Sequence, residues 1–127
     1  MGAYEITLPK TIEQTENKVR EVLSNNGFGV LTEINVSKIL KEKIQVDRTP
    51  LKILGACNPV FANQALEIDP SVALLLPCNV VLESLAENST RVSIVNPREM
   101  MDNPLLEALA TQASEILEKV VGELDLN

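Results

Sequence analysis

Two cysteines are the residues of this chain whose type and surroundings could do chemistry. Each is followed directly by asparagine, as Cys57-Asn58 and as Cys78-Asn79. A thiolate is a nucleophile and a ligand for soft metal ions, and an asparagine side chain can both donate and accept hydrogen bonds to a small molecule. We therefore take Cys57, Asn58, Cys78 and Asn79 as the candidate ligand-binding residues, and we identify no catalytic residue.

The same four residues also have purely structural explanations. Free cysteine is among the most frequently buried residue types. Asn58-Pro59 is typical of a helix start, and a turn at a strand end accounts for Asn79. Cys57 would lie beside the positive end of that helix, which lowers a thiol pKa. Three alternatives stay open: buried structural thiols, a reactive or ligand-binding pair, and a disulfide.

Histidine is absent from the sequence, which excludes several kinds of chemistry. Catalytic Ser-His-Asp and Cys-His arrangements and histidine-ligated metal sites all require it. Two thiolates could hold Cu(I), but no carboxylates stand at a spacing that would complete a zinc site, so we expect no metal and no cofactor. The glycines form no phosphate-binding loop. Because only carboxylates and thiols remain as proton acceptors, the sequence favours a non-catalytic protein over an enzyme.

Length and composition indicate one ordinary globular domain spanning residues 1–127. Of the 127 residues, 45% are hydrophobic and 23% are charged, which argues against disorder or a fibrous protein. The net charge of -7 disfavours nucleic acid and anionic membrane surfaces as partners. We see neither an export signal nor an apolar run long enough to span a membrane, so we expect a cytoplasmic protein with reduced thiols.

The charges are unevenly distributed along the chain. Residues 38–52 contain five basic and two acidic side chains, a local +3, whereas residues 83–127 contain three basic and nine acidic side chains, a local -6. Charge complementarity between two copies is one reading of this asymmetry. A basic loop and a solvated helix face are the other.

Hydrophobic periodicity predicts the elements that must position the cysteines. Alternation over residues 3–8 is typical of a strand, and Thr11 with Gln14 has the form of a capping box that opens a helix ending at Asn26-Gly27. We predict further strands at 29–35, 51–56, 77–84 and 90–95, short helices at 36–43 and 59–67, and a last helix from Asn103-Pro104. The apolar stripe of that last helix is predicted to be Leu105, Leu109, Ala113, Ile116, Val120 and Leu124.

This order, β-α-β-β-β-β-α with short helical insertions, predicts an α+β fold of two layers. A mainly antiparallel five-stranded sheet would carry its helices on one face. If the third and fourth strands are antiparallel neighbours, Cys57 and Cys78 meet at one end of the sheet. Strand alternation groups Cys57 with Ile53 and Cys78 with Val80, which we interpret as one apolar side.

The far side of the sheet is also predicted to be apolar. We assign Leu31, Leu54, Val81 and Val95 to it. An apolar face left in water is an association site, so we predict a homodimer. The alternative is that residues 36–48 fold over that face within one chain.

The sequence resembles a known family, the domain of unknown function 302 (DUF302), over essentially its whole length and most closely from Leu51 to Val81. The resemblance is carried by Ile53-Leu54-Gly55-Ala56-Cys57-Asn58-Pro59, by Leu74-Leu75-Leu76-Pro77-Cys78-Asn79-Val80-Val81, and by Phe28-Gly29-Val30-Leu31-Thr32-Glu33-Ile34. It implies a strand, a helix, four strands and a helix, a tendency to dimerise, and no established activity. Its paired motifs map onto Cys57, Asn58, Cys78 and Asn79. Relatives often carry His and Arg where this chain has Asn63 and Gln64, and an aromatic at Leu51.

Two functions follow from the sequence. In the first, the chain is a small-ligand or thiol-dependent binding module that uses the paired Cys-Asn motifs. In the second, it is a non-catalytic dimerisation or protein-interaction module whose cysteines belong to the core.

Overall fold

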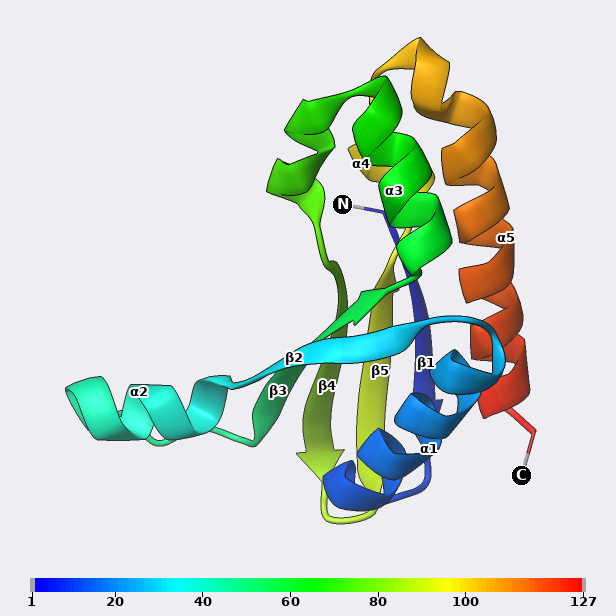
Figure 1. Ribbon diagram of the computed structural model, residues 1–127. Coiled ribbons are helices and arrows are strands. Elements are labelled where there is room, and N and C mark those ends of the chain that lie inside the picture. The colour runs from blue at the N-terminus through cyan, green and yellow to red at the C-terminus, as the bar shows by residue number, and fades with distance from the viewer. Residues whose placement is uncertain (1, 127) are drawn as a thin grey trace.

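The computed structural model describes residues 2–126 and has one five-stranded sheet at its centre (Figure 1). The strand order is β1-β5-β4-β3-β2, and every neighbouring pair is antiparallel. This arrangement confirms the predicted α+β fold. The strands are β1 (Ala3–Leu8), β2 (Gly29–Asn35), β3 (Leu51–Cys57), β4 (Cys78–Ala86) and β5 (Ser89–Val95).

The helices differ in how closely they pack on the sheet. Figure 1 shows α1 and α5 beside the sheet, α3 beside α5 at one end of it, and α2 projecting away from the rest. The helical elements are α1 (Ile12–Asn25), α2 (Val36–Ile44), α3 (Pro59–Ile68), α4 (Pro97–Met100) and α5 (Glu107–Leu124), with 3₁₀ turns η1 (Pro70–Leu75) and η2 (Pro104–Leu106).

Side-chain caps set where most of these helices begin. Thr11 and Gln14 form the predicted capping box of α1, each accepting a hydrogen bond of 3.1 Å from the other's backbone N–H. Asn58 caps α3 and is followed by proline, as predicted. The same Asn-Pro pattern opens α4 at Asn96, a helix that we did not predict although the signal was present in the sequence.

One face of the sheet forms the core beneath α1 and α5. Its central side chains are fully buried: Leu54, Ala56, Val80, Leu82, Val92 and Ile94. Leu54 is directly paired with Val80 and so lies on this covered face, not on the far side. Our assignment of Leu54 to the uncovered face was therefore wrong by one step of the alternation.

The buried stripe of α5 is also rotated from the predicted one. Ala113, Val120 and Leu124 are buried as predicted, but Leu105 is 74% exposed. Leu106 and Leu117, which lie outside the predicted stripe, are buried. The α-helix begins only at Glu107, and Leu105 lies in the preceding 3₁₀ turn η2, where the spacing of an α-helical stripe does not apply.

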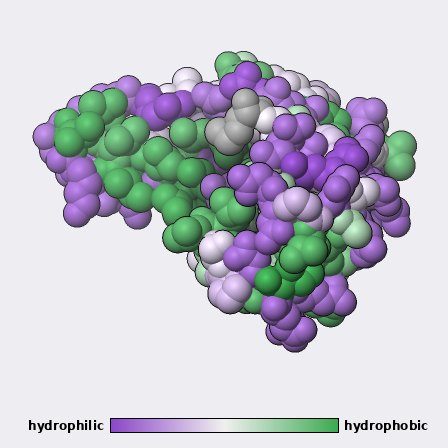
Figure 2. Space-filling view, turned by 90° about the horizontal axis from the view of Figure 1, so that it is seen from above, coloured by the Kyte–Doolittle hydropathy of each residue, from purple (hydrophilic) through white to green (hydrophobic). Residues whose placement is uncertain are grey.

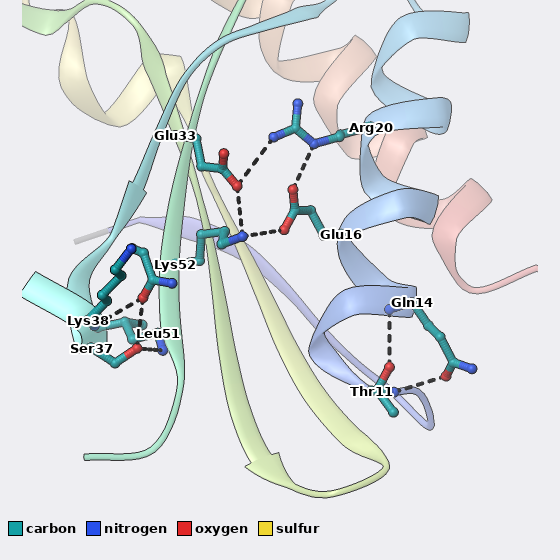
Figure 3. Close-up of polar contacts among 10 residues, drawn as sticks. Thr11, Gln14, Glu16, Arg20, Glu33, Ser37, Lys38, Leu51 and Lys52 are labelled. Atoms are coloured by element: carbon teal, nitrogen blue, oxygen red, sulfur yellow. Dashed lines mark hydrogen bonds and ion pairs between the residues drawn. The ribbon is translucent and has the colours of Figure 1, made fainter. Parts of the chain in front are cut away.

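Charged side chains fix α1 to the β2–β3 edge of the sheet (Figure 3). Lys52 Nζ donates to Glu16 Oε1 at 2.8 Å and to Glu33 Oε1 at 2.7 Å. Arg20 Nε donates to Glu16 Oε2 at 2.9 Å, which closes the cluster on the helix side. Three elements are thus joined by one network of alternating charge.

Strand β2 lies at an edge of the sheet and is irregular. The register of β2 with β3 shifts between Val30 and Thr32, which leaves Leu31 without a partner in a β-bulge. Leu31 is 67% exposed as a result.

The segment after β2 forms an arm, residues 36–46, that contains α2. None of the α2 residues is buried, and the helix ends at Gln45 in the left-handed conformation, with φ 55°. Figure 2 shows apolar surface along this arm and on the adjoining part of the body, and the exposed apolar side chains include Ile39, Ile44 and Val46. Residues 36–46 therefore do not fold over the uncovered face, and of the segment 36–48 it is Arg48 that contacts that face, through its ion pair with Glu83.

Within residues 2–126 there is no helix with both the length and the apolar character needed to span a bilayer.

Candidate functional site

The two cysteines meet at one end of the sheet. Ala56 of β3 is directly paired with Cys78 of β4, so Cys57 and Cys78 lie one register step apart, as the predicted antiparallel pairing requires. The register also corrects the prediction that both thiols share one side. Ile53, which shares a face of the sheet with Cys57, is paired with Val81. Val81 lies on the opposite face from Val80 and Cys78, so the two cysteines point to opposite faces of the sheet.

Both cysteines nevertheless line the same cavity, because it opens where β3 ends and Cys57 is the last residue of that strand. The cavity has a volume of about 40 Å³ and lies between the end of the sheet, α3 and α5. Two of the three aromatic residues of the chain, Phe28 and Phe61, contribute to its wall together with Met101.

Small residues on two facing helices leave the space open. Ala62 and Ala65 of α3 and Ala110 and Ala113 of α5 all line the cavity, each pair three residues apart and so on one side of its helix. Among the lining residues that the structure describes, none is charged, and Asn58 is the only one with a polar amide side chain. The wall is therefore apolar apart from one amide and two thiols.

Burial keeps both thiols in the neutral form. Burial raises the pKa of the Cys57 thiol. It raises the pKa of the Cys78 thiol further, to about 11, and the nearby Cys57 thiolate adds to this effect. The sequence-based idea that the α3 N-terminus lowers the pKa of Cys57 is not what the structure shows. Neither sulfur is an activated nucleophile at neutral pH.

The two asparagines take different positions. Asn58 lines the cavity, but its side-chain oxygen is occupied as the cap of α3, accepting from the N–H groups of Val60 at 3.0 Å and Phe61 at 3.1 Å. Asn79 is exposed and is paired with Gly55 on the opposite face of the sheet from Cys78. The structure thus brings together Cys57, Asn58 and Cys78, and it leaves Asn79 outside the cavity.

Sequence reasoning missed the residues that make the cavity. Phe28, Phe61 and Met101 were not considered as site residues, and of the four alanines only Ala113 was given a role, as part of the apolar stripe of α5. The scarcity of aromatics and the i,i+3 spacing of alanines on both helices were the signals available. In residues 2–126, no group of three or more Cys, Asp or Glu side chains is placed to hold a metal ion.

Comparisons with known proteins agree with this architecture. A family model described as "Domain of unknown function DUF302" matches residues 4–124. The crystal structure of an uncharacterized conserved DUF302 protein from Bacillus stearothermophilus is similar at 29% sequence identity and a TM-score of 0.86, over 96% of this chain and 97% of that chain. A search of curated proteins gives no match.

Proposed function

The chain belongs to the DUF302 family, and from that premise we propose that it is a small-ligand-binding domain whose guest enters the cavity beside Cys78. One observation carries this proposal: a preformed apolar cavity with no charged side chain among its described lining residues. A water molecule inside it would find few hydrogen-bond partners, so an uncharged apolar group can displace it at little cost.

The size of the cavity limits what it can take. At about 40 Å³ it is far smaller than the roughly 300–1,000 Å³ typical of pockets for drug-sized ligands. It has room for the apolar end of a guest, about three non-hydrogen atoms. Because the thiols are neutral, we assign them the role of soft, polarisable wall groups that contact the guest.

Titration with 3-methyl-1-butanol, followed by amide chemical-shift changes, tests the proposal. Ala62→Leu fills the cavity from α3 and is expected to weaken binding about tenfold or more, since it takes the space of two or more buried methylenes. Ala108→Leu, at an exposed position of α5, is the matched control and should bind as the original chain does. Absence of binding, or equal binding by Ala62→Leu, would refute the function.

Self-association through the α2 arm is a second candidate function. The observation that favours it is a nine-residue helix without a single buried residue, since helices this short are not stable in water without a packing partner. The arm belongs to the basic part of the chain, and α5 lies in the acidic part. A second copy of the chain therefore supplies both apolar surface and opposite charge.

A further inference from the structure

A second, polar depression adjoins the apolar cavity. This depression has a volume of about 350 Å³ and lies over α4, η2 and the start of α5. Met101 and Ala110 line both spaces. The two spaces therefore share the part of their walls that Met101 and Ala110 form, and a guest that extends past Met101 would contact both.

The depression differs from the cavity in carrying charges of both signs. Arg98 lines it together with Asp102 and Glu107, and Asn103 and Thr111 add an amide and a hydroxyl. Two carboxylates in this space disfavour a phosphate or another multiply charged anion. A space lined by one guanidinium and two carboxylates instead matches a zwitterionic head group, which carries one positive and one negative charge.

These charged groups do not neutralise one another. Arg20, Arg48 and Arg91 all lie within ion-pairing distance of a carboxylate. Arg98, within the described residues 2–126, has no carboxylate oxygen within 4.0 Å, and neither Asp102 nor Glu107 has a basic nitrogen within that distance. All three are thus available to a ligand.

The backbone at Arg98 is held in place by hydrogen bonds, which fixes the point from which its side chain extends. The Arg98 N–H donates to Asn96 Oδ1 at 3.1 Å and lies 3.3 Å from Ser114 Oγ. Ser114 is fully buried in α5 and donates to the same Asn96 oxygen at 2.6 Å. This cluster ties the short helix α4 to the helix that forms the cavity wall.

We propose that the guest is a free α-amino acid with a small aliphatic side chain. The branched end of its side chain occupies the cavity between α3 and α5, its carboxylate faces Arg98, and its ammonium group faces Asp102 and Glu107. This assignment rests on the proposed ligand-binding function and names the chemical class of its ligand. It uses every charged group of the depression and places no charge in the cavity.

L-leucine and three analogues that share its isobutyl group test the assignment by isothermal titration calorimetry. 4-Methylpentanoate lacks the ammonium group, 3-methylbutylamine lacks the carboxylate, and 3-methyl-1-butanol lacks both. We expect leucine to bind about fivefold more tightly than either singly charged analogue, the effect of one solvent-accessible ion pair.

Two substitutions assign the charges to residues. Arg98→Gln should weaken leucine and 4-methylpentanoate about fivefold and leave 3-methylbutylamine unchanged. Glu107→Gln should weaken leucine and 3-methylbutylamine and leave 4-methylpentanoate unchanged. Lys43→Gln, which removes a charge on the distant α2 arm, is the control for net charge and should change none of them.

The outcomes separate this inference from the function on which it rests. If 3-methyl-1-butanol binds and Ala62→Leu blocks it, but leucine binds no more tightly than the alcohol, the amino-acid assignment is overturned and the cavity function stands. Equal effects of Arg98→Gln and Lys43→Gln on leucine also overturn the assignment. If neither leucine nor the alcohol binds, both proposals fail.

Discussion

Ala56 and Cys78 face each other as a direct pair across β3 and β4. Cys57 follows Ala56 in the strand, so its side chain leaves the backbone towards the opposite face from that of Cys78. A disulfide needs Cβ atoms about 3.5–4.5 Å apart with side chains directed at each other. The sheet does not offer this arrangement, and both cysteines are free thiols.

The two thiols should differ in their rate of alkylation. Iodoacetamide labelling of the single-cysteine variants Cys57→Ala and Cys78→Ala, followed by mass spectrometry, measures each sulfur alone. A pKa near 11 instead of 9.0 lowers the thiolate fraction of Cys78 at neutral pH about 100-fold, so its labelling should be slower and should still rise with pH above 9. Cys57, with a smaller rise in pKa, should label first. Rapid labelling of Cys78 at pH 7 in folded protein would contradict the assignment of neutral thiols.

Gly55 should tolerate no side chain. A Cβ built on Gly55 would lie 2.6 Å from Cγ of the Pro77 ring and would overlap the Thr32 hydroxyl. We expect Gly55→Ala to lower the free energy of unfolding by about 1–3 kcal/mol, the usual effect of overpacking. Gly29→Ala in the neighbouring strand is the control, because nothing lies within 4 Å of the added Cβ there. Urea unfolding curves measure both, and equal stabilities of the two variants would count against the packing described here.

The Lys52 network should give stability a characteristic pH dependence. Partial burial acts to raise the pKa of Glu16, but hydrogen bonds from Lys52 and Arg20 outweigh it and lower that pKa. Hydrogen bonds from Glu16 and Glu33 raise the pKa of Lys52. The Glu16 contribution is therefore present above pH 4.5 and is lost as pH falls through the lowered pKa, whereas the Lys52 contribution is present below pH 10.5 and is lost as pH rises through the raised pKa.

Lys52→Met should remove both effects. We expect it to cost about 1–2 kcal/mol near neutral pH and to flatten the dependence at both ends, as measured by urea unfolding between pH 3 and 11. Lys43→Met, at an exposed position of α2 that makes no ion pair with residues 2–126, serves as the control. An unchanged pH profile in Lys52→Met would show that the network contributes nothing to stability.

The α2 arm should decide the oligomeric state. Ile39 and Ile44 are 42% and 59% exposed, and replacing both with Glu adds charge to the surface that we propose for a second copy. Sedimentation velocity at tens of micromolar should show a dimer for the original chain and a monomer for the double variant. Leu74→Glu, at an 88% exposed leucine of η1, should leave the dimer intact. A monomeric original chain would refute self-association.

Periodicity and cap signals were enough to predict the sheet and the main helices. All five strands and the capping box of α1 follow from local pattern, because alternation and capping act between residues that are near in sequence. The helix α4 was missed, although Asn96-Pro97 repeats the signal of Asn58-Pro59. Only four residues long, it leaves no periodicity to support the cap.

The site was only partly predictable for a different reason. The antiparallel pairing that brings the cysteines together followed from strand order, but which face each one occupies depends on a one-residue step in register that no local pattern fixes. The cavity arises where alanines of α3 meet alanines of α5, more than 40 positions apart in the chain. Such a space is a property of tertiary packing and not of either helix alone.

The bulge at Leu31 has a consequence for how the protein behaves when concentrated. Strand β2 ends the sheet, so one row of its backbone N–H and C=O groups has no strand beside it. A straight edge of that kind is a template onto which further molecules can add strand by strand into fibrils. The extra residue kinks the edge and breaks its regular repeat, which protects the folded protein from this route of aggregation.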